Sequence, residues 1–212
     1  MAEKKINKHE LRTKETRELL LRSAETIFVR DGYEGAELGE IAALAGRTKG
    51  AIYAQFESKE DIFLALVEQR VTRYRAQMEE MLAGSKSVEE SLAALRQFCF
   101  KLTEDQAWAL LFLEFKLFAI RHPESKERLG RLLDEVSPGD QEKRLVQLFG
   151  PAGKGKDNLR RSVAVAMIPA LLSALAVETK FRPALLDDSV LRKITNRIFD
   201  ALIQPSPHAS EH

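Results

Sequence analysis

Residues 38–63, LGEIAALAGRTKGAIYAQFESKEDIF, constrain the fold of this 212-residue chain more than any other segment. Gly46 is expected to end a first short helix, because glycine adopts the left-handed backbone without a side-chain clash. Thr48 offers a hydroxyl that can cap a second helix, and Ile52 and Phe56, four residues apart, form the buried stripe of that helix. The segment therefore predicts a helix-turn-helix.

Helical spacing of apolar residues recurs along the rest of the chain, whereas the sequence shows no strand pattern and no internal repeat. This pattern predicts an all-α fold of about nine helices. The expected helices cover residues 12–31, 38–45, 49–55, 58–82, 87–104, 106–121, 158–181 and 187–203, with another beginning at residue 124.

The chain is expected to divide into two domains and a tail. An amino-terminal domain over residues 1–57 begins with a flexible arm over residues 1–11, and a helical domain follows over residues 58–204. A helix that starts near Ser58 links the two domains, with acidic residues in its first turn where they complement the helix dipole. Residues 205–212 are expected to be a disordered tail.

Composition excludes several kinds of site. The net charge is +1, so binding to a polyanion has to come from local placement of charge. The single cysteine, Cys99, excludes an internal disulfide and a cysteine metal cluster, and its apolar neighbours favour a buried thiol over a redox sensor. The four histidines are scattered, so we expect neither a metal site nor a cofactor.

No secretory or membrane segment is expected. The amino terminus lacks the apolar core of a signal peptide. The longest uncharged run, residues 162–177, is shorter than the roughly 20 residues that a helix needs to span a bilayer. We therefore expect a cytoplasmic protein.

Two observations argue against an enzyme. Residues 150–156 fit the G-x-x-x-x-G-K pattern of a phosphate-binding loop, but Asp157 replaces the magnesium-binding serine or threonine and no strand precedes the segment. No set of nucleophile, base and orienting residue is recognisable elsewhere. We expect residues 150–156 to form a flexible basic loop and the protein not to be an enzyme.

The helix-turn-helix resembles the amino-terminal domain of the TetR (tetracycline-repressor-like) family of regulators. The resemblance covers residues 12–66 and is carried in the motif by Ile41-Ala42, Ala45-Gly46, Thr48-Lys49-Gly50, Tyr53-Ala54-Gln55-Phe56 and Ser58-Lys59-Glu60. The first helix and its closing turn contribute Arg17, Leu20, Leu21, Ala24, Ile27, Phe28, Gly32 and Tyr33. Beyond this region only the general layout of the family matches.

The resemblance implies that the second helix of the motif enters the major groove of DNA. Tyr53 and Lys59 match family positions that contact the phosphate backbone, and Lys49 suits a phosphate as a point charge. Gln55 retains a donor for a phosphate oxygen. Positions that face the groove in family members match Thr48, Lys49, Gly50, Ala51 and Ala54.

Four further residues flank this surface. Lys14 and Arg17, near the start of the first helix, are placed to meet the flanking phosphate backbone. Arg47 departs from the small residue usual in the family, and it either forks onto a guanine edge, contacts a phosphate or stays solvated. Glu37 stands where the family often has a capping serine or threonine, and it either caps the helix or turns away from the DNA.

One short helix reads too few base pairs for useful specificity, so such proteins bind two half-sites related by a twofold axis. The resemblance places a dimer interface on the helices expected over residues 158–181 and 187–203. The candidate interface residues are Leu171, Leu175, Leu191, Ile194, Ile198 and Leu202. The alternative is that these two helices pack only within one subunit.

Residues 108–120 form the most apolar segment, as expected of a helix in the middle of a bundle. In the family the middle helices surround an effector pocket. The candidate walls of that pocket are Phe98, Trp108, Phe112 and Phe115. Ordinary core packing is the alternative for each of them, and Glu114 in the same segment is expected to be a solvated or paired acid.

These expectations together predict a transcriptional regulator that responds to a ligand. Its simplest form is a homodimeric repressor that binds a palindromic operator on double-stranded DNA. An unknown small-molecule effector with substantial apolar surface releases it by preferring the conformation that misfits the operator. The alternatives are a DNA-binding regulator controlled by a protein partner and a helical small-molecule-binding protein without an operator.

Overall fold

The computed structural model describes residues 8–123 and 156–203, and within these ranges it contains eight helices and no strand. The helices are α1 (Lys8–Gly35), α2 (Leu38–Leu44), α3 (Lys49–Tyr53), α4 (Lys59–Ala83), α5 (Val88–Glu104), α6 (Gln106–Arg121), α9 (Lys156–Phe181) and α10 (Asp188–Ile203). The all-α fold expected from the sequence is confirmed. The helix expected from residue 124, the loop over 150–155 and the tail over 205–212 lie outside the described residues.

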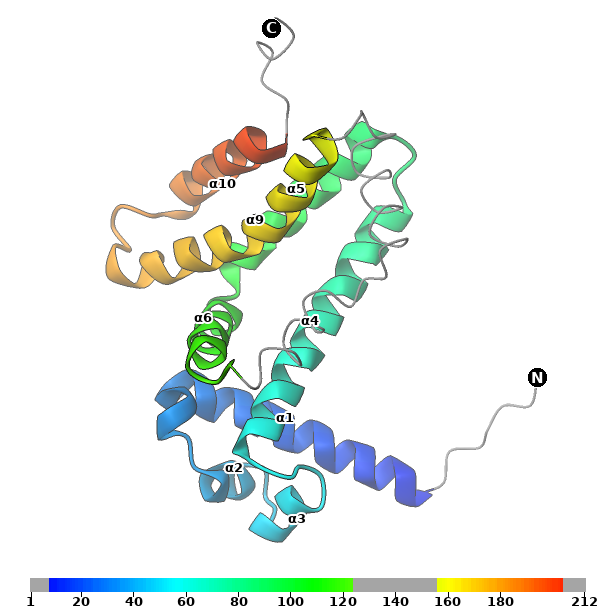
Figure 1. Cartoon of the computed structure of the whole chain (residues 1–212), viewed down its shortest axis with the longest axis vertical. Coiled ribbons are helices and arrows are strands. Elements are labelled where there is room, and N and C mark those ends of the chain that lie inside the picture. Colours follow the sequence, from blue (N-terminus) through cyan, green and yellow to red (C-terminus); the bar gives the residue numbers. More distant parts are fainter. Residues whose placement is uncertain (1–7, 124–155, 204–212) are drawn as a thin grey trace, which may run out of the picture.

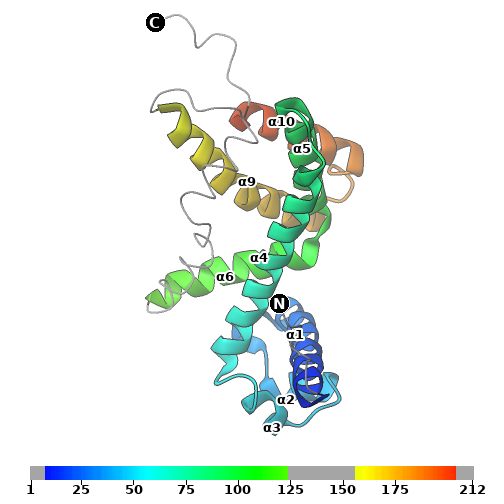
Figure 2. The same cartoon turned by 90° about the vertical axis from the view of Figure 1, so that its right-hand side faces the viewer.

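The helices are arranged in two groups joined by one long helix. Helices α1, α2 and α3 lie at one end and α5, α9 and α10 at the other, and α4 runs from one end to the other (Figure 1). Helix α6 crosses between the two groups, where it contacts α1, α4 and α9 (Figure 2). We call α1–α3 the head and α5, α6, α9 and α10 the body.

Helix α1 is longer than expected at both ends. It begins at Lys8, so residues 8–11 are helical and do not belong to a flexible arm. Gly32 interrupts the helix with a φ of 71°, in the left-handed region that glycine tolerates. The turn expected at this glycine is therefore present, and a short helical stretch follows it.

Hydroxyl caps set the start of two long helices. Ser58 Oγ accepts a hydrogen bond from the Asp61 amide at 3.0 Å before α4, and Ser87 Oγ accepts one from the Glu90 amide at 3.1 Å before α5. Both helices begin where the sequence predicts. Thr48 also occupies the N-cap position of α3, but its side chain makes no cap hydrogen bond, so the hydroxyl cap expected there is wrong.

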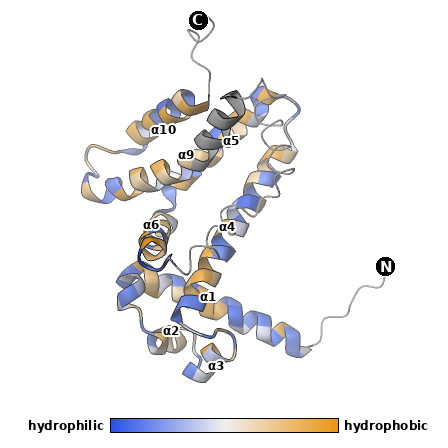
Figure 3. Ribbon diagram, in the orientation of Figure 1, coloured by the Kyte–Doolittle hydropathy of each residue, from blue (hydrophilic) through white to orange (hydrophobic). Residues whose placement is uncertain are grey.

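One hydrophobic core runs through the head and into the body. Residues 62–67 of α4 are all buried, which requires that other elements surround the helix. Helix α1 of the head and α6 of the body pack against α4, and hydrophobic residues colour much of α6, whereas the outer stretch of α1 is mostly hydrophilic (Figure 3). The head and the body therefore share a core.

The turn at the end of α1 docks onto α6. The Tyr33 amide donates to Glu114 Oε1 at 2.9 Å, and the Tyr33 ring lies 5.0 and 4.5 Å from the rings of Phe63 and Phe118, between centroids. A Cβ atom on Gly32 would lie 3.3 Å from the same carboxylate oxygen, so glycine leaves room for this contact. Glu114, expected to be a solvated or paired acid, is thus paired with a backbone amide of the head.

Two features of the body bear on expectations from the sequence. Cys99 is 2% exposed, and burial raises the pKa of its thiol to about 12, so the thiol stays protonated and unreactive. The buried cysteine is as expected. Helix α9 contains Pro169 within its length.

None of the helices over the described ranges is long and apolar enough to cross a bilayer.

Helix α10 packs on α5 and α9 through side chains at four-residue spacing. These are Leu191, Thr195, Phe199 and Ile203. Arg96 of α5 fastens the contact, because its Nη2 lies 2.6 Å from Asp200 Oδ1 and its guanidinium lies 4.6 Å from the centroid of Phe199. Thr195 is 1% exposed and its hydroxyl has no hydrogen-bond partner.

Replacing Thr195 by valine is expected to raise the free energy of unfolding by about 1 kcal/mol, because a methyl group replaces a buried hydroxyl without a partner. Thr103 provides the matched control, because it is equally buried but its hydroxyl donates to the Phe100 carbonyl oxygen at 2.7 Å. Thr103→Val is expected to lower the same free energy by about 1 kcal/mol. Urea unfolding measures both variants, and equal losses would show that the Thr195 hydroxyl is satisfied.

Candidate nucleic-acid interface

The turn between α2 and α3 has the geometry expected of the motif. Gly46 has a φ of 61°, and the amides of Gly46 and Arg47 donate to carbonyl oxygens of α2 at 3.0 and 2.8 Å, which closes the end of that helix. Ile52 and Phe56 are 0 and 2% exposed. The expected turn and the expected buried stripe are therefore both present.

Most residues expected to face DNA lie on the outer side of α3. Tyr53 is 60% exposed, so its hydroxyl group extends beyond the protein surface on a rigid ring. The other exposed members of the set are Arg47, Thr48, Lys49, Gly50 and Ala54, whereas Ala51 and Gln55 are half-buried. Glu37 is exposed and makes no side-chain cap at α2. The structure thus gives α3 an outward face that a partner can approach.

Lys49 passes close to α2. A Cβ atom on Gly39 would come within 2.7 Å of Lys49 Cε and 3.3 Å of its Nζ. Because glycine has no side chain, Gly39 leaves room for the Lys49 side chain, whose ammonium group lies where α2 and α3 meet. The role of Gly39 is not visible in the sequence, because the pairing of these two residues depends on how the helices cross.

Lys59, expected to contact a phosphate, is engaged inside the head. Its Nζ donates to the carbonyl oxygens of Glu34 and Ala36 at 3.0 and 3.3 Å and lies 4.8 Å from the centroid of the Tyr33 ring. Lys59 therefore ties the start of α4 to the turn between α1 and α2. A phosphate would have to compete with both carbonyl groups for this ammonium.

Arg17 is engaged in a similar way. Its Nη1 donates to the Gln55 carbonyl oxygen at 3.3 Å, and its guanidinium lies 4.3 Å from the centroid of the Phe56 ring. This contact braces the carboxyl-terminal end of α3 against α1. Arg17 thus supports the helix that faces outward, and the phosphate contact expected from the sequence stays a prediction.

A groove of about 260 Å³ separates the first turns of α1 from α3. Its lining residues are His9, Arg12, Thr13, Thr16, Ala51, Ala54 and Gln55. The α1 members follow a spacing of three and four residues, which is one face of a helix. Hydroxyl, amide and guanidinium groups in one groove suit the oxygens of a phosphate backbone.

Lys14 does not line this groove. On a helix that turns 100° per residue, position 14 lies roughly opposite to the face formed by positions 9, 12, 13 and 16. Lys14 is exposed, but it points away from α3, whereas Arg12 points toward it. Arg12 was not among the residues expected at the DNA, although its helical spacing from His9 and Thr16 is a signal present in the sequence.

The four expected walls of an effector pocket are all buried side chains. Phe98, Trp108, Phe112 and Phe115 are 7, 5, 6 and 1% exposed. Trp108 and Phe112 lie 5.4 Å apart between ring centroids, and Phe112 and Phe115 lie 6.5 Å apart. Within the described ranges these rings line neither the groove at α3 nor the hollow in the body, and their place in an effector pocket stays a prediction.

The hollow in the body has a volume of about 500 Å³ and lies where α5, α6, α9 and α10 approach one another. Its lining residues are Phe100, Thr103, Glu104, Gln106, Thr179, Pro183, Leu186, Asp187, Asp188 and Leu191. Among the residues that can be described, no three or more His, Cys, Asp or Glu side chains are grouped to hold a metal ion.

The expected dimer-interface residues differ in exposure. Leu191 is 7% exposed and packs within its own subunit, so the structure excludes it from a free surface. Leu171 is 39% exposed. The remaining four are half-buried: Leu175, Ile194, Ile198 and Leu202.

Sequence comparisons locate the same region. Residues 20–66 match the family described as "Bacterial regulatory proteins, tetR family". The HTH-type transcriptional repressor BepR of Brucella suis is 49% identical over 53 residues, which is 25% of each chain. The fatty acid metabolism regulator protein of Bacillus subtilis is 29% identical over 83 residues, 39% of this chain and 43% of that protein. These matches span less than half the length of the relatives.

Solved structures extend the similarity of fold to most of the chain. A transcriptional regulator from a Rhodococcus species gives a TM-score of 0.68 at 21% identity and covers 89% of this chain and 96% of its own. FadR from Bacillus subtilis, solved in complex with stearoyl-CoA, gives 0.58 at 20% identity, with coverages of 88% and 97%. Residues 20–66 of this chain therefore form a helix-turn-helix domain of the tetR family of bacterial regulatory proteins.

Proposed function

We propose that this protein is a transcriptional regulator that binds operator DNA through α3 and responds to a small-molecule effector. The observation that carries the proposal is the outward face of α3, which bears the exposed Tyr53 and Lys49, together with a nearby groove between α1 and α3 that is lined by Arg12. The buried stripe of Ile52 and Phe56 fixes that face outward. Relatives named as transcriptional repressors support the proposal.

We further propose that the protein binds a palindromic operator as a homodimer, most simply as a repressor. Helix α3 has only five residues, so one head reads few base pairs and a second head related by a twofold axis supplies the rest. The proposed interface lies on α9 and α10 and leaves out Leu191. It comprises Leu171, Leu175, Ile194, Ile198 and Leu202.

The proposed effector is a small molecule with substantial apolar surface. The body is rich in aromatic and aliphatic side chains around α6, and the FadR of similar fold was solved with stearoyl-CoA. The effector acts if it binds more tightly to the arrangement of heads that misfits the operator.

Selection of bound fragments from a random pool of duplex DNA tests the function. The expected result is a palindromic consensus whose half-sites are centred about one helical turn apart or a multiple of it, because two α3 helices enter the major groove on one side of the duplex. Uniform weak retention of every fragment would contradict the proposal. Size measurement of the purified protein checks the dimer independently.

Arg12→Ala is expected to reduce the slope of log affinity against log salt by about one unit, because one phosphate contact in the groove is lost. Lys14→Ala is the matched control, since it removes the same charge from the opposite face of α1 and should leave the slope nearly unchanged. Fluorescence anisotropy with operator DNA at several salt concentrations measures both. Equal effects would show that charge, rather than the groove, accounts for the loss.

Lys49→Ala is expected to weaken binding to all DNA sequences and to lower the salt slope by about one unit. Lys59→Ala is expected to act mainly on stability, because it removes the donor to two backbone carbonyl oxygens. Its expected cost is about 1–3 kcal/mol in the free energy of unfolding. If Lys59→Ala instead lowers the salt slope without loss of stability, Lys59 contacts a phosphate as the sequence led us to expect.

A further inference from the structure

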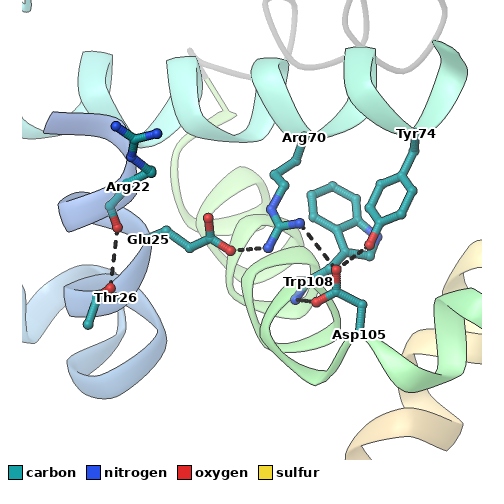
Figure 4. Close-up of polar contacts among 7 residues, drawn as sticks. All are labelled: Arg22, Glu25, Thr26, Arg70, Tyr74, Asp105 and Trp108. Carbon is teal, nitrogen blue, oxygen red and sulfur yellow. Dashed lines mark hydrogen bonds and ion pairs between the residues drawn. The ribbon is translucent and has the colours of Figure 1, made fainter. Parts of the chain in front are cut away.

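Arg70 joins three helices at the place where the head meets the body (Figure 4). It lies on α4, and its side chain is 11% exposed. Its Nη2 pairs with Glu25 Oε1 of α1, and its Nη1 lies 3.1 Å from Asp105 Oδ2 at the start of α6. One guanidinium thus reaches an acid of the head and an acid of the body from opposite sides.

Asp105 is itself held in place. Its Oδ1 accepts a hydrogen bond from the Trp108 amide at 2.9 Å and caps α6, and its Oδ2 accepts one from the Tyr74 hydroxyl at 2.5 Å. Burial disfavours the ionised carboxyl, but the bonds from Tyr74 and Trp108 and the charge of Arg70 outweigh it and lower the pKa of Asp105. The body therefore presents a fixed carboxylate to Arg70.

Glu25 and Asp105 share one cation. Arg70 Nε is buried without a hydrogen-bond partner, so the guanidinium is held through its two terminal nitrogens alone. A half-buried charge that loses one partner is left poorly compensated. Each arm of the bridge therefore depends on the other arm.

The Arg70 bridge and the Tyr33 contact together fix the angle between the head and the body. Glu25 lies in the long helical part of α1, and Tyr33 follows the break at Gly32, so the two contacts hold the head at different points. A single contact at Tyr33 allows the head to rotate about it, whereas a second contact at Glu25 prevents that rotation. Tyr33 contacts Glu114 of α6 directly, whereas Glu25 reaches Asp105, the capping residue of α6, through Arg70 of α4.

We propose that Arg70 is a positioning residue that locks the angle between the DNA-binding head and the body by bridging Glu25 and Asp105. It touches no DNA, and its effect on operator affinity rests on the proposed function. A change at the start of α6 reaches α1 through this guanidinium, because releasing Asp105 also weakens the hold on Glu25.

The angle is measured without DNA. Spin labels on cysteines at the exposed positions Ala43 of α2 and Gln97 of α5 report the distance between head and body, and dilution with unlabelled protein restricts the signal to one subunit. Glu25→Gln and Asp105→Asn keep the shape of each side chain, and asparagine still caps α6. Each is expected to broaden the distance distribution.

Asp200→Asn is the matched control, because it removes the acid from an ion pair that lies wholly within the body, with Arg96 at 2.6 Å. It should leave the distribution as narrow as in the unaltered protein. Distributions unchanged in both Glu25→Gln and Asp105→Asn would overturn the proposal, as would equal broadening in Asp200→Asn.

Operator binding provides the second measurement. Glu25→Gln and Asp105→Asn are each expected to lower operator affinity by about tenfold, the size of one interaction within a network, with an unchanged salt slope. The double variant should lose little more than either single variant, because both break the same bridge. If the double variant loses affinity by the product of the two single losses, or if the salt slope falls, the shared bridge is contradicted. The two proposals can fail separately. If the variants broaden the distance distribution but the unaltered protein selects no operator, the proposed function is refuted and the role of Arg70 in fixing the angle still holds.

Discussion

The burial of residues 62–67 of α4 between α1 and α6 governs how the two halves of this molecule are related. Each large apolar side chain buried there contributes roughly 1.5–3 kcal/mol, so α4 cannot turn or slide alone without exposing core to water. A displacement of the body is therefore passed to the head through a helix packed against both. The hydrophobic effect has no direction, however, and it holds the halves together without fixing their angle.

Directional contacts at the edge of that core fix the angle between the head and the body. Glu114 accepts the Tyr33 amide at 2.9 Å, and Arg70 lies between Glu25 and Asp105. Asp105 caps the first turn of α6 and Glu114 lies further along the same helix. A shift of α6 therefore acts on both contacts at once, which makes this helix the most direct route from the body to the head.

Local chemistry made much of the fold predictable, and long-range pairing limited the prediction of the site. Ser58 and Ser87 cap helices whose starts the sequence predicted, because a hydroxyl three residues before its amide needs no distant partner. Arg17 and Lys59 were expected on DNA but bond to carbonyl oxygens 38 and 23–25 residues away. Only the folded chain shows which basic side chains remain available.

Because Arg17 and Lys59 are bonded within the head, the proposed regulator has to gain affinity for DNA in another way. Both side chains are engaged there, so each head offers fewer cations to the phosphates than the sequence suggests. One head alone then binds DNA weakly. Two heads on one duplex bind far more tightly, because the second contact is intramolecular once the first has formed, provided that the geometry allows both. Affinity in such a protein depends on the angle of the head as well as on its charge, so a buried arginine that holds the angle between head and body bears on operator binding.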